Sequence, residues 1–346
     1  MAATESRRAG AVVALRYERG ALLALDQTVL PWTERTLQLR SAEDVAAAIK
    51  RLSIRGAPLI GVAAGYGVAL SLAAEPGIDA LSRACATLLA SRPTAVNLAW
   101  AVERVRGAAL AADEGRIAAA ALAEAEAIHA DEIAASEASA IHGADLLPDV
   151  RRVLTHCNTG ALAAPGRGTA LSVIAELAAR GRLEGVIATE TRPLLQGARL
   201  TVYELGKLGI DHELVVDGAA AGLIARGIVD AVLVGCDRVA ANGDVANKVG
   251  TYPLALAAHA AAIPFVVVGP ISTIDTGCPS GAAIEIEERD ADEVRFARGA
   301  PLTVQGTRCR NPAFDVTPAA LVAALVTERG VAQPVDTASI AALLER

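Results

Sequence analysis

The chain has 346 residues, of which 53% are hydrophobic, and it carries a formal net charge of −7 at pH 7. This length suffices for one large domain or two smaller ones, and the apolar content is enough to fill a core. Arginines are scattered and aromatic residues make up only 3% of the chain, whereas a nucleic-acid surface needs clustered basic side chains and stacking rings. We therefore expect a globular protein that binds no nucleic acid.

The sequence predicts neither a membrane span nor a secretory signal. The longest apolar run, residues 59–74, is rich in glycine and shorter than the roughly 20 residues that a membrane helix needs, so we interpret it as a buried helix. Residues 1–10 are polar, and no apolar stretch with a small-residue cleavage site follows them. We expect a cytoplasmic protein without membrane contact.

The cysteines and histidines indicate neither disulfides nor a metal site. The five cysteines lie far apart and form no C-x-x-C motif, which is typical of free thiols in a reducing compartment. The five histidines form no H-E-x-x-H motif and have no carboxylate partner at helical spacing. We predict no structural or catalytic metal.

The first half of the chain is predicted to be mostly helical, with a small β-structure at its start. Ser41 can cap one of the helices, and Pro58 can open the apolar one. The expected strands are residues 11–17, 21–27 and 37–39, the first two forming a hairpin, and the expected helices are 42–52, 58–74, 78–90 and 96–142, the last interrupted near 113–115.

Beyond residue 150 the pattern alternates between strand and helix, which is typical of a parallel sheet. The expected strands are residues 153–156, 186–189, 213–216, 231–234 and 265–268, and the expected helices are 169–180, 196–208, 219–225 and 249–262. We therefore predict an α/β fold with a parallel-sheet domain over residues 146–346. A smaller, mostly helical domain carrying the hairpin is predicted over residues 1–145.

Polar and reactive residues follow the predicted strands. They are His156-Cys157-Asn158, Glu190-Thr191-Arg192, Asp217-Gly218, Cys236-Asp237-Arg238 and Gly269-Pro270. Because parallel strands end at the same edge of a sheet, we expect these residues to share one rim.

A possible anion site follows the fourth of these strands. Asn247-Lys248 are predicted to stand at the N-terminus of the helix over residues 249–262, where free N–H groups and the helix dipole favour an anion. Asp237 lies just upstream in a polar, glycine-bearing loop. An aspartate beside a phosphate-sized anion site indicates a phosphorylated substrate.

A dinucleotide cofactor is not expected. Gly166-Arg167-Gly168 matches half of a glycine-rich fingerprint, and Glu190 stands near the position of a ribose-binding acid. However, Leu171 occupies the place of the third glycine, and the loop from Cys157 to Gly168 is longer than the tight turn that such a site needs.

Several long motifs resemble those of the methylthioribose-1-phosphate isomerase family, in consistent order from about residue 12 onward. They are Ile54-Arg55-Gly56-Ala57-Pro58, Arg92-Pro93-Thr94-Ala95-Val96-Asn97-Leu98, residues 156–163, 190–199 and 235–248, Gly250-Thr251-Tyr252, Ser272-Thr273-Ile274-Asp275, and residues 311–318. The resemblance implies an enzyme of methionine salvage that needs no cofactor and is usually dimeric. It also implies a Rossmann-like C-terminal domain and a fold similar to regulatory subunits of a translation-initiation exchange factor.

The resemblance assigns roles to single residues. Cys157 and Asp237 fall on the catalytic positions of the family. The substrate-binding positions fall on Arg55, Gly56, Ala57, Arg92, Gln196, Asn247 and Lys248.

The implied reaction, from 5-methylthioribose 1-phosphate to 5-methylthioribulose 1-phosphate, suits these residue types. A phosphate on the anomeric oxygen blocks ordinary ring opening, so an acid must assist cleavage of the ring C–O bond; Asp237 can serve if burial keeps it protonated. Hydrogen must then move from C2 to C1, either through a Cys157 thiolate or as a direct hydride shift. Arg55, Arg92 and Lys248 would hold the phosphate.

Each candidate also has a purely structural interpretation. A cysteine at a strand end is commonly a small core residue, and Asp237 can be a helix cap or the partner of Arg238. The segment around Arg55 can be a helix entry, Arg92 a solvated loop residue, and Gln196 the start of a helix. Cys236 is expected to pack rather than react, because its side chain should point away from that of Asp237.

Two functional alternatives remain open at this point. The same fold can act on another ribose 1-phosphate, such as 5-deoxyribose 1-phosphate or ribose 1,5-bisphosphate, because the pocket at the 5-position decides the substrate. The second is a non-enzymatic binding protein that resembles the regulatory subunits, for which the thiol and the acid would be dispensable.

Overall fold

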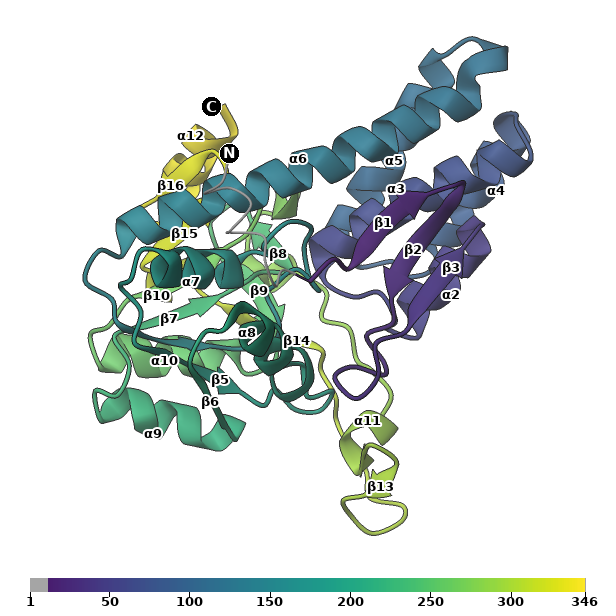
Figure 1. Ribbon diagram of the computed structural model, residues 1–346. Coiled ribbons are helices and arrows are strands. Elements are labelled where there is room, and N and C mark those ends of the chain that lie inside the picture. Colours follow the sequence, from purple (N-terminus) through teal and green to yellow (C-terminus); the bar gives the residue numbers. More distant parts are fainter. Residues whose placement is uncertain (1–11, 346) are drawn as a thin grey trace.

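The computed structural model describes residues 12–345 (Figure 1). The prediction that no secretory signal is present concerned residues 1–10, which lie outside the described residues, as does residue 11 of the first predicted strand. The molecule has a mostly helical N-terminal half and a sheet-based C-terminal half, and the predicted α/β class is confirmed.

The N-terminal half begins with the predicted hairpin and third strand. An antiparallel sheet in the order β1-β2-β3 is formed by β1 (Leu15–Glu18), β2 (Ala21–Leu25) and β3 (Thr36–Leu39). The helices that follow are α2 (Ala42–Lys50), α3 (Ala57–Ala74), α4 (Ile78–Leu89) and α5 (Val96–Ala111). The Ser41 side chain accepts a hydrogen bond from the Asp44 N–H, so the predicted cap of α2 is confirmed.

Helix α3 is the core of this half. Among residues 12–345 it alone has the length and hydropathy of a membrane span, and 83% of that window is buried inside the protein. It packs against α2, α4, α5 and α6. Its glycines allow close approach, since a Cβ on Gly61 would lie 2.7 Å from the Asn97 carbonyl oxygen in α5. A helix enclosed on all sides is apolar all round, as predicted for this run.

Helix α6 (Ile117–Leu146) joins the two halves. It follows the short η1 (Glu114–Arg116), where the predicted interruption falls, and runs along one side of the whole molecule (Figure 1). It contacts α3 and α5 in the N-terminal half, and α7, β15 and β16 in the C-terminal half. The division of the chain between residues 145 and 146 stays a prediction, because α6 packs against both halves of the molecule.

The C-terminal half is built on a seven-stranded sheet in the order β16-β15-β10-β7-β4-β5-β6. Its strands are β4 (Arg152–Thr155), β5 (Gly185–Thr189), β6 (His212–Val215), β7 (Ala231–Val234), β10 (Phe265–Val268), β15 (Ala324–Thr327) and β16 (Gly330–Ala332). The five predicted strands are confirmed to within a residue or so. Of the six pairs of neighbouring strands, five are parallel, and the pair β15–β16 is antiparallel.

Helices cover both faces of this sheet (Figure 1). They are α7 (Ala170–Ala179), α8 (Val202–Leu208), α9 (Ala220–Ala225), α10 (Thr251–Ala260) and α12 (Thr337–Glu345). One core cluster joins the sheet to the end of α6, α7 and α8, and another joins it to α9, α10 and α12. Five short helical turns complete the half: η2 (Gly197–Thr201), η3 (Asp217–Ala219), η4 (Ile271–Thr273), η5 (Gly281–Ala283) and η6 (Ala319–Leu321).

A second, smaller sheet was not predicted. It has the order β11-β8-β9-β14 and consists of β11 (Ile274–Asp275), β8 (Arg238–Ala240), β9 (Val245–Lys248) and β14 (Phe314–Thr317). The prediction that Asn247 and Lys248 begin a helix is therefore wrong: both lie in β9, and α10 begins at Thr251 after Gly250. Pairing of β9 with β14, a strand far along the chain, overrides the local helical pattern.

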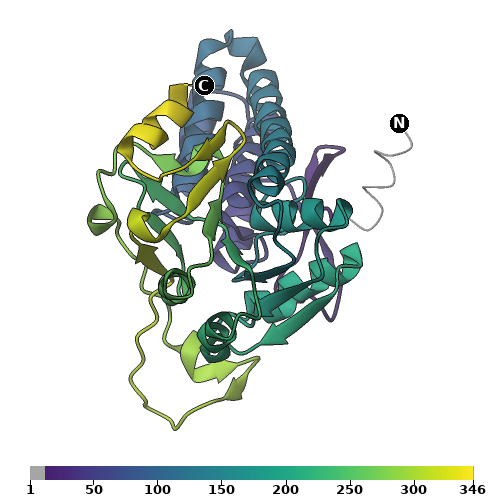
Figure 2. The same cartoon turned by 90° about the vertical axis from the view of Figure 1, so that its left-hand side faces the viewer.

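Two C-terminal features complete the fold. Residues 285–311 leave the body as an excursion that carries α11 (Asp292–Arg295), β12 (Phe296–Ala297) and β13 (Ala300–Pro301), and it projects in both views (Figures 1 and 2). In the apolar segments 321–325 and 340–344, Leu325, Ile340 and Leu343 are buried in the chain's own core.

Candidate active site

The predicted site residues meet around one cavity of about 200 Å³. The cavity lies where β4 and β7 end, beside the start of α3 and the small sheet. Seven of the predicted residues line it: Arg55, Gly56, Arg92, Cys157, Gln196, Asp237 and Lys248. The thiol and the carboxyl group, separated by 80 positions in the sequence, therefore face the same space.

Two predicted residues, Ala57 and Asn247, are not part of the wall of this cavity. Ala57 lines an adjoining cavity of about 50 Å³ together with Gly56, Arg92 and Asp237. Asn247 is buried, and its Nδ2 donates to the Thr251 hydroxyl at 2.9 Å, so it secures the first turn of α10.

Cys157 occupies a strained turn just after β4. Its φ of 63° is in the left-handed region, which costs a side-chain-bearing residue about 1–2 kcal/mol. Its N–H donates to the Thr191 hydroxyl at 2.9 Å, and its carbonyl accepts from the Thr201 hydroxyl at 2.6 Å. These two bonds hold the turn that presents the thiol to the cavity.

Asp237 follows β7, and its N–H donates to the Ala246 carbonyl at 2.9 Å. Part of the residue reaches the cavity, but protein atoms enclose the carboxyl group closely enough for burial to raise its pKa, and Lys248, Arg55 and Arg92 oppose this rise. A carboxyl group with a raised pKa keeps its proton to higher pH, as a general acid must.

Lys248 is the cation at the centre of the site. Its Nζ donates to the Ala313 carbonyl at 2.7 Å and lies 4.8 Å from the centre of the Phe314 ring. Burial lowers its pKa, while electrostatic interactions with Cys157 and Asp237 act in the opposite direction. The lysine is therefore close enough to interact electrostatically with both Cys157 and Asp237.

Arg55 and Arg92 approach from the N-terminal half. Arg55 Nη1 donates to Asn158 Oδ1 at 2.6 Å, and its Nη2 to the Asn158 carbonyl at 3.1 Å. Arg92 Nη2 donates to Glu287 at 2.8 Å. Gly56 is required beside Arg55, because its φ is 96° and a Cβ there would lie 2.4 Å from the Ala163 carbonyl oxygen.

Sequence reasoning missed several residues of the wall. Arg51, Arg199 and Arg289 add three cations, and an apolar part is formed by Leu52, Leu194, Leu200 and Phe314. Arg199 stands in one of the family-like motifs, so its position there was a usable signal. Arg289 lies at the root of the excursion, where no local pattern connects it with the site.

Polar atoms without partners gather at this cavity. Among the described residues, eight buried side-chain nitrogen or oxygen atoms lack a hydrogen-bond partner, and four of them belong to residues of this wall: Gln27 Oε1, Arg92 Nε, Gln196 Oε1 and Arg199 Nε. Buried polar groups are normally satisfied, so such a cluster indicates a place for a polar ligand. With six cationic side chains in the wall, that ligand is expected to be anionic.

Other reactive residues are engaged elsewhere. Cys236 packs against the apolar core, its Sγ fills the space beside Gly269, and burial raises the pKa of its thiol, so the predicted packing role is confirmed. In residues 12–345 no three His, Cys, Asp or Glu side chains are grouped to hold a metal ion.

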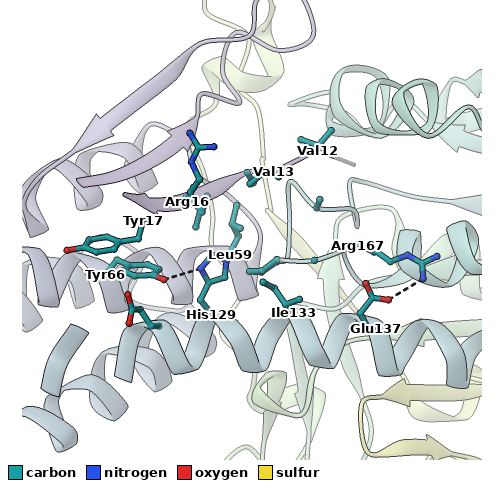
Figure 3. Close-up of a pocket in the computed structure, with 16 residues that line it drawn as sticks. Val12, Val13, Arg16, Tyr17, Leu59, Tyr66, His129, Ile133, Glu137 and Arg167 are labelled. Atoms are coloured by element: carbon teal, nitrogen blue, oxygen red, sulfur yellow. Dashed lines mark hydrogen bonds and ion pairs between the residues drawn. The ribbon is translucent and has the colours of Figure 1, made fainter. Parts of the chain in front are cut away.

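A larger cavity, of about 770 Å³, lies between β1, α3 and α6 (Figure 3). The Tyr66 hydroxyl and His129 Nδ1 form a hydrogen bond of 3.1 Å on its wall, and Arg167 pairs with Glu137 at its other end. None of the predicted site residues lines it. Size alone therefore does not identify the site.

The chain is similar to known proteins over almost its whole length. It matches the Initiation factor 2 subunit family over residues 53–334. It is 51% identical over 333 residues to a methylthioribose-1-phosphate isomerase of Alcanivorax borkumensis, covering 94% of this chain and 95% of the relative.

Solved structures agree with this similarity. A 5-methylthioribose 1-phosphate isomerase from Pyrococcus horikoshii OT3 has a TM-score of 0.91 at 37% identity, covering 98% of both chains. A structure of translation initiation factor eIF-2B, subunit delta, from A. fulgidus has a TM-score of 0.84, also at 37% identity, covering 97% of this chain and 100% of that one. The chain thus belongs to the Initiation factor 2 subunit family and, within it, to the methylthioribose-1-phosphate isomerases.

Proposed function

We propose that this chain isomerises 5-methylthioribose 1-phosphate to 5-methylthioribulose 1-phosphate, a step of methionine salvage. One observation carries the proposal: a thiol, a partly buried carboxyl group with a raised pKa and a set of cations line the same small cavity. The identity of about 50% to enzymes with this name supports the substrate.

Asp237 is the proposed acid that opens the sugar ring. The anomeric oxygen carries a phosphate, so the ring oxygen must be protonated as its bond to C1 breaks. Burial raises the pKa of Asp237, which favours the protonated form that this step consumes. The nearby cations limit the rise and would stabilise the carboxylate once the proton has left.

Cys157 is the proposed group for the transfer of hydrogen from C2 to C1. The electrostatic interaction with Lys248 would stabilise a thiolate, the form that can remove the C2 proton. A direct hydride shift, with Cys157 only polarising the substrate, is the alternative. A substrate with deuterium at C2 separates the two, because thiolate-mediated transfer exchanges the label with water and a hydride shift retains it.

The phosphate is proposed to bind the cations of the wall. Arg55 and Arg92 present planar guanidinium groups, suited to bidentate contact with phosphate oxygens, and Lys248 acts as a point charge. Gln196 lines the same cavity and is proposed to hydrogen-bond a sugar hydroxyl through its amide. Gly56 and Ala57 let the ligand approach the backbone at the start of α3, and Asn247 acts on the site through the start of α10.

The 5-position of the sugar selects among related substrates. Leu52, Leu194, Leu200 and Phe314 give the cavity an apolar part, which suits a methylthio group better than a second phosphate. Arg51 and Arg199 line the same cavity and could bind a second phosphate, so ribose 1,5-bisphosphate is also tested as a substrate. Turnover of the methylthio, 5-deoxy and 5-phospho sugars under one condition would decide between them.

A homodimer in the cytoplasm is part of the proposal. The described cysteines are free thiols, which suits a reducing compartment. Light scattering of the purified protein tests the dimer. A monomeric mass at micromolar concentration would refute it.

The proposed function is tested with purified protein and 5-methylthioribose 1-phosphate, following the ketose by NMR. Asp237→Asn should lower kcat by about 10²–10⁴-fold, the usual contribution of general acid catalysis. Asp230→Asn is the matched control, because Asp230 precedes the same strand and accepts from the Arg151 and Arg152 amides at the opposite edge of the sheet. Absence of ketose with the wild-type protein would refute the function, and full activity of Asp237→Asn would remove the acid from it.

A further inference from the structure

A buried carboxylate outside the cavity lies directly behind Arg55. Glu204, in α8, is 3% exposed and does not line the proposed active site. Its Oε1 accepts from Asn158 Nδ2 at 2.7 Å, and it also accepts from the Leu162 amide at 3.4 Å. Nothing in the proposed chemistry uses this acid.

Asn158 connects this carboxylate to the active-site arginine. Its amide nitrogen points to Glu204 and its amide oxygen to Arg55, an orientation that the two charged partners require, since only the nitrogen can donate and only the oxygen can accept. Arg55 is held a second time by the Asn158 main-chain carbonyl. The chain Glu204–Asn158–Arg55 is therefore continuous from α8 to the cavity.

The same carboxylate also fixes the turn that carries Cys157. Backbone amides of Ala161 and Leu162 bond to it. Gly160 packs directly on it, because a Cβ there would lie 2.4 and 2.5 Å from its two oxygens. One turn earlier, the Thr201 hydroxyl bonds the Cys157 carbonyl and accepts from Asn158 Nδ2 at 3.3 Å. The segment 157–162 is thus tied at several points to Thr201 in η2 and to Glu204 in α8.

We propose that Glu204 is a positioning residue of the isomerase: through Asn158 it sets the guanidinium of Arg55 for the substrate phosphate, and through the backbone of residues 160–162 it supports the turn at Cys157. The inference rests on the proposed function. The positioning depends on the charge of Glu204, because a carboxylate orients the Asn158 amide more strongly than a neutral acceptor does.

The protonation of Glu204 makes the idea testable. Burial raises its pKa from 4.5 to about 7, and the hydrogen bonds and Arg55 oppose the rise. The charged or titratable groups around it are Arg55, Tyr203 on its own helix, and Arg167, Glu184 and Asp211 in a groove that Glu204 also reaches. The acid is therefore charged above pH 7 and increasingly neutral below it.

Glu204→Gln permanently imitates the neutral acid. At pH 8 its KM should exceed the wild-type value about 10-fold or more, as expected when a hydrogen bond to a charged group is lost. At pH 6 the wild-type Glu204 is itself mostly protonated, so the ratio of the two KM values should fall toward one. Titration of the substrate phosphate cancels in this ratio. A KM ratio of one at pH 8, or a raised ratio that does not change with pH, would overturn the proposal.

Two further variants complete the experiment. Glu176→Gln is the control, because Glu176, on α7, is buried to a similar degree but pairs with Arg167 and Arg180, neither of which lines the proposed active site. It should lower stability and leave KM unchanged at both pH values. If Glu204→Gln does not fold, Asn158→Ala removes the bridge while leaving both ends. It should raise KM about 10-fold, and an unchanged KM would contradict the inference. Wild-type turnover, measured first, tests the proposed function separately.

Discussion

A second buried acid, Glu132, allows a quantitative test of the packing between the two halves. It lies in α6 at 5% exposure, and its Oε1 accepts from the Ser272 hydroxyl at 2.9 Å. Ser272 in turn accepts from Asn97 Nδ2 at 2.8 Å, so this group links α5, α6 and η4. Burial raises the pKa of Glu132 from 4.5 to about 7, helped by Glu328 and Asp131 and opposed by the Ser272 bond and Arg104.

The sign of the effect on stability follows from this rise. The folded state binds the proton of Glu132 more tightly than the unfolded state does, so its contribution is fully present below pH 4.5 and is lost as the pH rises through about 7. At about 1.4 kcal/mol for each tenfold change in proton affinity, the loss by pH 8 is about 3 kcal/mol. Glu132→Gln keeps the shape and the acceptor but cannot ionise.

The assay is urea unfolding of wild type and Glu132→Gln at pH 4.5 and pH 8. The free energy of unfolding of the variant minus that of wild type should increase by about 3 kcal/mol from pH 4.5 to pH 8, because only wild type is destabilised by ionisation of Glu132. Glu137→Gln on the same helix is the control, since the Glu137 side chain is 53% exposed and pairs only with Arg167; its difference from wild type should stay within about 1 kcal/mol. A Glu132→Gln variant whose stability difference is the same at both pH values would refute the reasoning.

Three further outcomes are expected. Lys248→Met should raise KM about 10-fold or more because the buried ammonium is lost from the anion site. Lys207→Met, which removes a half-exposed pair with Glu34 and a contact with the Tyr203 ring outside the cavity, should leave KM unchanged, and equal KM values for the two variants would count against phosphate binding by Lys248. Gly56→Ala should destabilise the protein by more than the roughly 1–2 kcal/mol that a positive φ costs, because the new Cβ would also clash with Ala163. Gly77→Ala is the control: its φ of 127° causes backbone strain, but no atom lies within 4 Å of the new Cβ. Equal unfolding free energies of the two glycine variants would show that the close approach is unimportant. Turnover should fall as the pH rises through the raised pKa of Asp237, and a kcat that is independent of pH on the alkaline side would argue against a protonated Asp237.

Local patterns in the sequence were enough to locate most elements. Helices such as α4 and α5, with clear starts and lengths of several turns, depend on hydrogen bonds within the segment, and their ends were found to within a few residues. The buried strands β7 and β10 were predicted at their observed bounds, because apolar runs of four residues between turns are typical of a parallel sheet. The polar residues that follow β4 and β7 were also identified, and the shared edge of the sheet brings Cys157 and Asp237 to one cavity.

The sequence by itself thus determined the class of fold, the order of the main helices and of five strands of the large sheet, and, through its long motifs, the family. Tertiary structure decided where Lys248 lies, because its strand is held by β14, which is distant in the chain. It also brought Arg51 and Arg289 into the wall and placed Glu204 behind Arg55. These arrangements depend on pairing and burial between distant segments, whose free energy is gained only when the whole chain packs, so no local pattern encodes them.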